Sequence, residues 1–155
     1  MRSIQSFRIV AFTCVAILVF ALFADASYAI DPVYKDIFGR AIKGTDPVAY
    51  FTEGKPTKGT REYTYEWKDA EWRFSSKENL LLFQENPEQY SPQFGGYCAS
   101  AVSQGYTASI DPKAWTIVND KLYLNYSLRV REKWSQDIPG NIKKAEKNWP
   151  ILLAE

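Results

Sequence analysis

The alternation of aromatic and polar residues along the chain predicts two β-hairpins. In residues 62–67, glutamate and threonine alternate with tyrosine and tryptophan, and the alternation resumes at residues 72–74 after a polar, turn-like stretch at residues 68–71. Two apolar runs, residues 116–118 and 122–126, flank a second polar stretch. Period-two alternation on both sides of a short polar turn is typical of antiparallel hairpins.

Other apolar runs predict a buried strand and a helix. The run at residues 48–51 has the length and composition of a buried strand. The spacing of Ser75 and Glu78 matches a capping box, so a helix is expected to begin there. Pro87 should end that helix, because the residue before a proline disfavours the α conformation. Residues 87–90 can then form one further turn.

The C-terminal half predicts three more helical segments. Gly95 and Gly96 begin a small-residue segment, which we interpret as a loop that enters a short helix with Cys98 near its first turn. Ser127 should cap a helix that runs to about Asp137, and residues 139–140, Pro-Gly, should break it. Helical spacing returns at residues 141–149. The inward-facing candidates of the capped helix are Leu128, Val130, Arg131 and Trp134. The pattern as a whole predicts one α+β domain, with small antiparallel hairpins packed against several short helices.

The first 29 residues have the features of a secretory signal peptide. Arg2 and Arg8 precede an apolar run of 15 residues, 9–23, and small residues follow up to Ala29. The run is shorter than the roughly 20 residues that span a bilayer, so cleavage is favoured over an uncleaved anchor. No arginine pair precedes it, which favours the general secretion route. We therefore expect a periplasmic or secreted protein, residues 30–155, without a membrane anchor.

Charge and composition exclude several classes of function. Removal of residues 1–29 lowers the count of basic residues from 19 to 17 and that of acidic residues from 18 to 17, which leaves a neutral domain. Nucleic acid is not expected as a partner, because phosphate binding depends on clustered lysine and arginine. The lysines of the last helical segment, Lys143, Lys144 and Lys147, are interpreted as a solvated face. Histidine is absent from the chain, which excludes catalytic machinery that depends on imidazole.

Cys98 is the only cysteine that remains after signal cleavage, since Cys14 lies in the apolar run. An unpaired cysteine in an exported protein is a buried small hydrophobe, a reactive thiol, a metal ligand or half of an intermolecular bridge. At a helix N-terminus, the helix dipole would favour its thiolate form. A homodimer with two Cys98 thiolates is a further alternative.

Several short motifs together resemble the YHS domain. These are Asp-Pro-Val at residues 46–48, Trp-Arg-Phe-Ser-Ser at residues 72–76, Phe83, and Asn-Pro-Glu-Gln-Tyr at residues 86–90. The resemblance covers residues 45–91 as the YHS core, and the rest of the chain is similar to exported single-domain YHS proteins of bacteria. YHS domains accompany copper-transporting ATPases and some oxygenase components, and they are suspected of binding metal through cysteines. The resemblance thus implies copper as a candidate cofactor.

The metal site of the family transfers less well than its fold. The positions at which YHS domains commonly place cysteine correspond to Ala49, Ser75 and Asn79, and none of these supplies a thiolate. Cys98 alone is too small a ligand set for Zn²⁺, which takes about four ligands, although Cu(I) accepts fewer soft ligands.

Three hypotheses remain open at this stage. The chain is an exported, non-enzymatic binding module with a copper-handling role, a thiol redox or sensor protein that acts through Cys98, or a structural or interaction domain with an inert cysteine. The candidate ligand-binding residues are Cys98, Tyr97 and Asp46, with Cys98 as the metal candidate. Asp46 precedes a proline and is also expected to initiate a turn. No catalytic residue is predicted, and the partner is a small ligand, a metal ion or an envelope protein.

Overall fold

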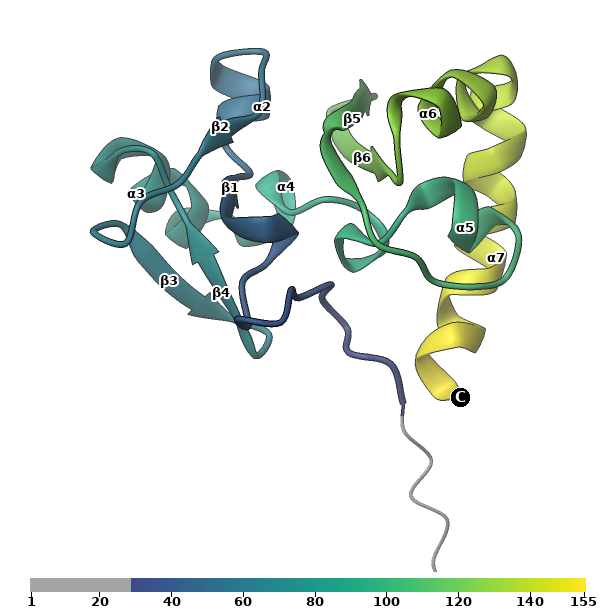
Figure 1. The fold of residues 1–155 in the computed structure, drawn as a ribbon, viewed down its shortest axis with the longest axis horizontal. Helices are drawn as coiled ribbons and strands as arrows, with labels where there is room; N and C mark the ends of the chain where they lie inside the picture. The colour runs from purple at the N-terminus through teal and green to yellow at the C-terminus, as the bar shows by residue number, and fades with distance from the viewer. Residues whose placement is uncertain (1–28) are drawn as a thin grey trace, which may run out of the picture.

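The computed structural model describes residues 29–155, and the predicted signal peptide lies outside this range except for its last residue, Ala29. Figure 1 shows two lobes side by side. The first lobe contains η1 (Ile42–Gly44), β1 (Thr45–Asp46), α2 (Ala49–Thr52), β2 (Thr57–Lys58), β3 (Thr64–Trp67), β4 (Ala70–Arg73), α3 (Lys77–Glu85) and α4 (Pro87–Tyr90). The second contains η2 (Phe94–Gly96), α5 (Ala99–Ser103), β5 (Asp111–Val118), β6 (Lys121–Asn125), α6 (Leu128–Trp134), η3 (Ser135–Asp137) and α7 (Ile138–Ala154).

The fold is α+β, as predicted. In the described part of the chain the strands form three antiparallel pairs, β1 with β2, β3 with β4 and β5 with β6, and short helices pack around them. No helix in residues 29–155 has the length and hydrophobicity needed to span a bilayer.

Both predicted hairpins are present. Each closes with a two-residue turn in which both residues have positive φ, at residues 68–69 and at residues 119–120. Such turns match the twist of paired strands. The first turn is shorter than predicted, because Ala70 and Glu71 already belong to β4. In the second hairpin, β5 begins at Asp111, earlier than the predicted run at residues 116–118.

The strand predicted at residues 48–51 is wrong, because this run forms the one-turn helix α2. Oδ1 of Asp46 accepts hydrogen bonds from the backbone N–H groups of Val48 at 2.9 Å and Ala49 at 3.2 Å. A short polar side chain that binds the backbone two and three residues ahead turns the chain into a helix. The burial expected of the run is correct, since Val48, Ala49 and Tyr50 are all buried.

The helix expected after Ser75 exists, but its cap is Ser76. The hydroxyl of Ser76 accepts from the backbone N–H of Asn79 at 3.2 Å, and α3 begins at the next residue. The capping box predicted for Ser75 and Glu78 is therefore wrong by one residue, because the side chain of Ser75 binds elsewhere. The helix ends before Asn86 as predicted, and α4 is the further turn.

Ser127 caps α6 as predicted, since its hydroxyl accepts from the N–H of Val130 at 3.3 Å. Trp134 is buried on the inner face of this helix, whereas Leu128, predicted to face inward, is 53% exposed. Leu128 is the first residue of α6.

The last helix begins earlier than predicted. Its cap is Asp137, whose Oδ1 accepts from the N–H of Gly140 at 3.0 Å, so Pro139 and Gly140 lie inside the first turn of α7. Proline is tolerated there because the first N–H groups of a helix have no intrahelical partner. The break predicted at residues 139–140 therefore lies at Asp137.

Two apolar clusters form the core. The larger one joins the lobes: Trp72, Phe74 and Phe83 of the first lobe pack in one cluster with residues of the second lobe that include Cys98 and Leu124. Its ring contacts are close, with 5.0 Å between the centroids of Trp72 and Phe83. The smaller cluster lies between α5, β6, α6 and α7; its buried members are Phe94, Ala99, Val102, Tyr123, Trp134, Ala145 and Leu152.

Candidate functional site

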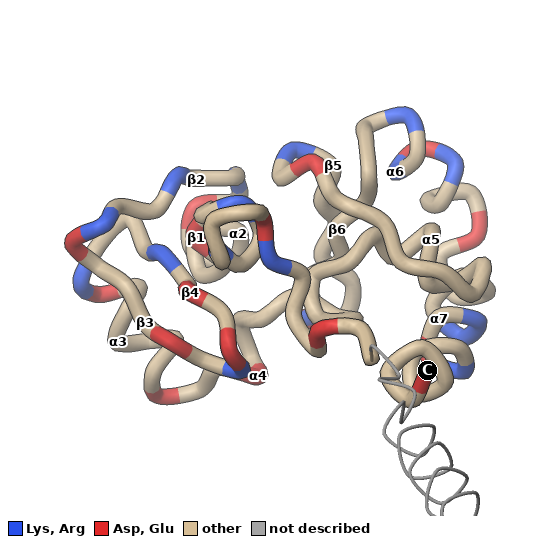
Figure 2. Tube along the Cα trace, turned by 60° about the horizontal axis from the view of Figure 1, so that its bottom comes forward, with Lys and Arg blue, Asp and Glu red and all other residues tan. Residues whose placement is uncertain are grey.

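A cavity of about 630 Å³ lies in the second lobe, where α5, α6 and the start of α7 meet. Its lining includes Cys98, Ser100 and Trp134, together with Lys133 from α6 and Lys144 from α7. Figure 2 shows basic positions on both α6 and α7, next to α5. We call this space the Cys98 cavity.

Cys98 lies at the entrance to α5, as predicted. The residue is 1% exposed, and its backbone N–H donates to the carbonyl of Ala108 at 3.1 Å. Gly95 and Gly96, with φ of +61° and +83°, allow the preceding turn that brings the chain to this point.

The thiol of Cys98 is held in a chain of hydrogen bonds. The backbone N–H of Tyr126 donates to Sγ at 3.3 Å, and Sγ lies 3.7 Å from Oδ1 of Asn125. The same Oδ1 accepts from the backbone N–H of Ser100 at 3.1 Å. A neutral S–H satisfies this arrangement, because it donates to Asn125 and accepts from Tyr126. A thiolate would place its charge against a carbonyl oxygen.

Two buried N–H donors of the second lobe have no partner among the described residues. One is Nδ2 of Asn125, which is 0% exposed, and the other is Nε1 of Trp134, which is 2% exposed. The orientation of the Asn125 amide follows from its contact with Ser100, since a reversed amide would face one N–H with another. Buried donors are nearly always paired with protein, water or a ligand, so these two require an acceptor that residues 29–155 do not provide.

Asp46, the second candidate, is the centre of a buried hydrogen-bond cluster in the first lobe. Its side chain is fully buried. Oδ1 accepts from the N–H groups of Val48 and Ala49. Oδ2 accepts from the N–H of Ser75 at 2.8 Å, the hydroxyl of Ser75 at 2.7 Å and the amide of Asn79 at 2.8 Å. Five donors therefore surround one carboxylate and offset the cost of its burial.

Tyr97, the third candidate, faces away from the cavity. Its hydroxyl donates to the carbonyl of Asp31 at 3.1 Å, and its ring lies 5.5 Å from that of Tyr34 and 5.9 Å from that of Trp149. Burial raises the pKa of Tyr97, with smaller contributions from Asp31 and Tyr34. The structure thus does not bring Cys98, Tyr97 and Asp46 together.

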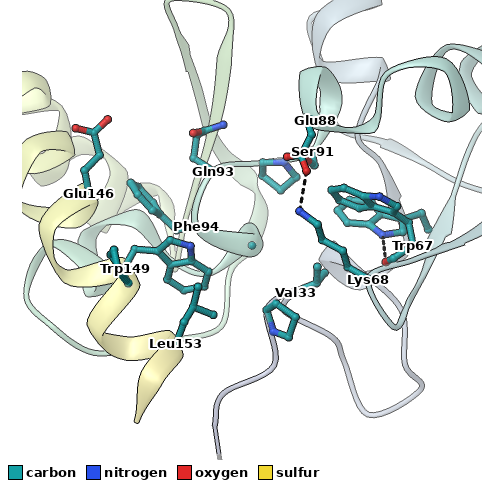
Figure 3. A pocket seen from close by; sticks show the side chains of 15 residues that line it. Val33, Trp67, Lys68, Glu88, Ser91, Gln93, Phe94, Glu146, Trp149 and Leu153 are labelled. Atoms are coloured by element: carbon teal, nitrogen blue, oxygen red, sulfur yellow. Dashed lines mark hydrogen bonds and ion pairs between the residues drawn. The ribbon is translucent and has the colours of Figure 1, made fainter.

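A second cleft, of about 380 Å³, lies between the lobes (Figure 3). Trp67 lines it on one side, and Phe94 and Trp149 line it on the other. Its cation, Lys68, is already engaged, because Nζ lies 2.8 Å from Oε1 of Glu88 and 4.2 Å from the centroid of the Trp67 ring. This cleft has aromatic walls, but none of the described residues that line it has an unpaired buried side-chain donor.

The family model of the YHS domain matches residues 48–94. The chain contains a YHS domain. The match lies close to the core predicted at residues 45–91. No curated protein and no solved structure matches the chain. The YHS domain ends four residues before Cys98, so the Cys98 cavity is built by the part of the chain that follows it.

Within the YHS domain, the three positions that the family resemblance marks for cysteine do meet in space. Ala49, Ser75 and Asn79 all donate to Asp46, through a backbone N–H, a backbone N–H with a hydroxyl, and an amide. In this chain the place is therefore taken by a carboxylate and its donors.

The residues present do not fit a metal ion at either place. Among residues 29–155, no group of three histidine, cysteine or acidic side chains is arranged to hold one. The oxygens of Asp46 already accept five hydrogen bonds. Cys98 has an amide N–H and an amide oxygen as partners, and neither neighbour is a soft ligand.

The sequence interpretation did not find the cavity residues other than Cys98, nor Asn125, which contacts Cys98. Trp134 is predicted only as an inward-facing residue, Lys144 as part of a solvated face, and Asn125 as a strand residue. No local pattern reveals that a buried N–H lacks a partner, because the partners of Asn125 and Trp134 would come from other elements. A polar residue at the end of an apolar strand, such as Asn125, is the one signal that pointed in this direction.

Proposed function

We propose that this chain is an exported, non-enzymatic binding module whose ligand binds in the Cys98 cavity. The observation that carries the proposal is that Trp134, whose buried Nε1 has no partner among the described residues, lines a cavity of about 630 Å³. Asn125, whose Nδ2 is also unpaired, contacts two residues of the lining, Cys98 and Ser100. Pockets that bind small molecules have volumes of roughly 300–1,000 Å³ and a few converging polar groups.

The surroundings of Cys98 favour binding over catalysis. A nucleophilic thiol is activated by an adjacent base that takes its proton. The partners of Cys98 are the N–H of Tyr126 and the amide oxygen of Asn125, and neither is a base. Handling of copper, which the family resemblance suggests, is not part of the proposal, because the contacts of Asp46 and Cys98 leave no ligand set for the metal.

Binding in the cavity can be tested by NMR. The chain has five tryptophans and therefore gives five indole N–H signals, of which one belongs to Trp134. A library of small anions, cations and neutral compounds is added to ¹⁵N-labelled protein. We expect some compounds to shift the Trp134 signal while the signals of Trp67 and Trp149, which line the other cleft, stay in place. A library that leaves the Trp134 signal unmoved would contradict the proposal.

Export is tested separately, by fractionation of cells that express the full chain and N-terminal sequencing of the product. The proposal predicts a soluble extracytoplasmic protein that begins at Ile30. Recovery of only uncleaved chain in the membrane fraction would show that residues 1–29 act as an anchor.

A further inference from the structure

Building on the proposed function, we infer that the Cys98 cavity binds a small organic anion, with an apolar body and one carboxylate or phosphate group. The inference rests on the chemistry of the lining, on the two unpaired donors and on the position of two lysines.

The lining is rich in hydrogen-bond donors and carries no negative charge. No aspartate or glutamate among residues 29–155 contributes to it. The polar side chains of Ser103 and Gln104 are already bound to Ser100, the first to its carbonyl at 2.8 Å and the second at 3.0 Å. These bonds use the donors of both side chains near the α5 backbone, whereas Nε1 of Trp134, another residue of the lining, has no partner among the described residues.

The two unpaired donors select an acceptor. An indole N–H can only donate, so Trp134 cannot be satisfied by a ligand that presents a donor. Nδ2 of Asn125 is likewise a donor, because its Oδ1 is held by the N–H of Ser100 and by the thiol of Cys98. A ligand that presents donors, such as an ammonium group, would leave both N–H groups unpaired. The complex would then carry the desolvation cost of two buried donors.

Two lysines distinguish a charged acceptor from a neutral one. Lys133 and Lys144 come from different helices and both line the cavity, with their residues exposed at its edge. The ion pairs of the described chain use other basic residues, namely Lys35, Arg40, Lys55, Lys68 and Arg73. A neutral carbonyl would satisfy the buried donors, but only an anion also gains from two lysines.

The remaining walls predict an apolar body on the ligand. Ala101 and Val130 contribute apolar surface. The rings of Tyr106 and Tyr126, which also line the cavity, are 52% and 58% exposed and lie free to stack on a ligand. A volume of about 630 Å³ is large for inorganic phosphate alone and suits a small organic molecule.

The test compares compounds of one shape and different charge on the exported protein. Benzoate and phenyl phosphate are titrated against the Trp134 indole signal, with benzamide as the neutral match and inorganic phosphate as the anion without an apolar body. We expect benzoate or phenyl phosphate to bind at least about 10-fold more tightly than benzamide. The stronger of the two identifies the acid group. Tighter binding of inorganic phosphate than of either aromatic anion would overturn the inference that the ligand has an apolar body.

Lysine variants provide the matched control. Lys144→Gln should weaken binding of the anion about 3- to 10-fold, as expected for loss of one partly screened charge. Lys143→Gln removes the same charge from the next position of α7, which does not line the cavity, and should leave the affinity unchanged. Equal binding of benzamide and benzoate, or equal effects of the two variants, would refute the inference that the ligand is an anion. The proposal that the chain is a binding module would not be affected by that result. Failure of every compound to move the Trp134 signal would refute both.

Discussion

The hydroxyl of Ser75 donates to Oδ2 of Asp46 at 2.7 Å, a contact between residues 29 positions apart in the chain. It joins the start of α3 to the end of β1, and the amide of Asn79 reinforces it from within the helix. The buried carboxylate thereby organises α2, α3 and β1 around one point, so its removal should affect folding more than binding.

Asp46→Asn should lower the free energy of unfolding by about 2–4 kcal/mol, because an amide group would face the donors of Ser75 and Asn79 with a donor of its own. Urea denaturation with an unchanged m value measures the effect. Asp69→Asn, at the exposed turn of the first hairpin, is the matched control and should change stability by less than about 0.5 kcal/mol. Equal effects of the two variants would show that the cluster at Asp46 contributes little.

Cys98 should react slowly with thiol reagents in the native protein. In a chain that carries Cys14→Ser it is the only thiol, and it is 1% exposed. We expect labelling at least about 100-fold slower than in urea, because reaction requires an opening of the structure. Labelling as fast in the native protein as in urea would instead favour the thiol redox hypothesis.

Gly95→Ala should destabilise the protein more than Gly54→Ala. Both glycines have positive φ, +61° and +66°, so either substitution strains the backbone by about 1–2 kcal/mol. A Cβ at Gly95 would also overlap the carbonyl of Pro32, whereas a Cβ at Gly54 meets nothing within 4 Å. Thermal or urea unfolding of the two variants should therefore differ by about 1–3 kcal/mol. Equal losses would show that the segment at Pro32 moves aside freely.

Acid should lower the free energy of unfolding, partly through protonation of Asp36. Burial by itself raises the pKa of Asp36, but hydrogen bonds from the side chain and backbone of Arg40 and from the N–H of Phe38 outweigh it, and the pKa lies below its usual value of 3.8. The resulting stabilisation is complete well above pH 3.8 and is lost as the pH falls through the lower pKa of the folded state.

Unfolding by urea at neutral pH and near pH 3 measures this loss. The wild-type protein should lose more stability between the two values than Asp36→Asn, which has no carboxyl to protonate at this position. Arg40→Met, which removes the side-chain hydrogen-bond partner of Asp36, should also lose less stability between the two pH values than the wild-type protein does. If these variants lose as much stability as the wild-type protein, the acid sensitivity comes from other carboxyl groups.

Local patterns in the sequence predicted much of the first lobe and the two hairpins. The aromatic alternation of residues 62–67 and 72–74 depends on neighbours in the chain, as does the end of α3 before Pro87, and the structure confirms both. The family motifs also lie within one short stretch, which is why the YHS domain could be predicted from residues 45–91.

Errors arose where a distant contact decided between two local options. A serine stands at both position 75 and position 76, and only the proximity of Asp46 to Ser75 leaves Ser76 as the cap of α3. The run at residues 48–51 is apolar enough for a strand or a buried helix, and the bonds from its N–H groups to Asp46 select the helix.

The sequence by itself determined the α+β class, the hairpins and the YHS domain, and it shows that Cys98 is the single cysteine of the predicted mature chain. The tertiary structure alone decided that Cys98 is buried beside Asn125, that the indole N–H of Trp134 lacks a partner among the described residues, and that Lys133 and Lys144 share one cavity. The physical reason is the distance along the chain over which each interaction acts. Periodicity and capping act over a few residues, whereas a cavity and an unpaired donor depend on side chains that only the packing of α5, α6 and α7 brings together.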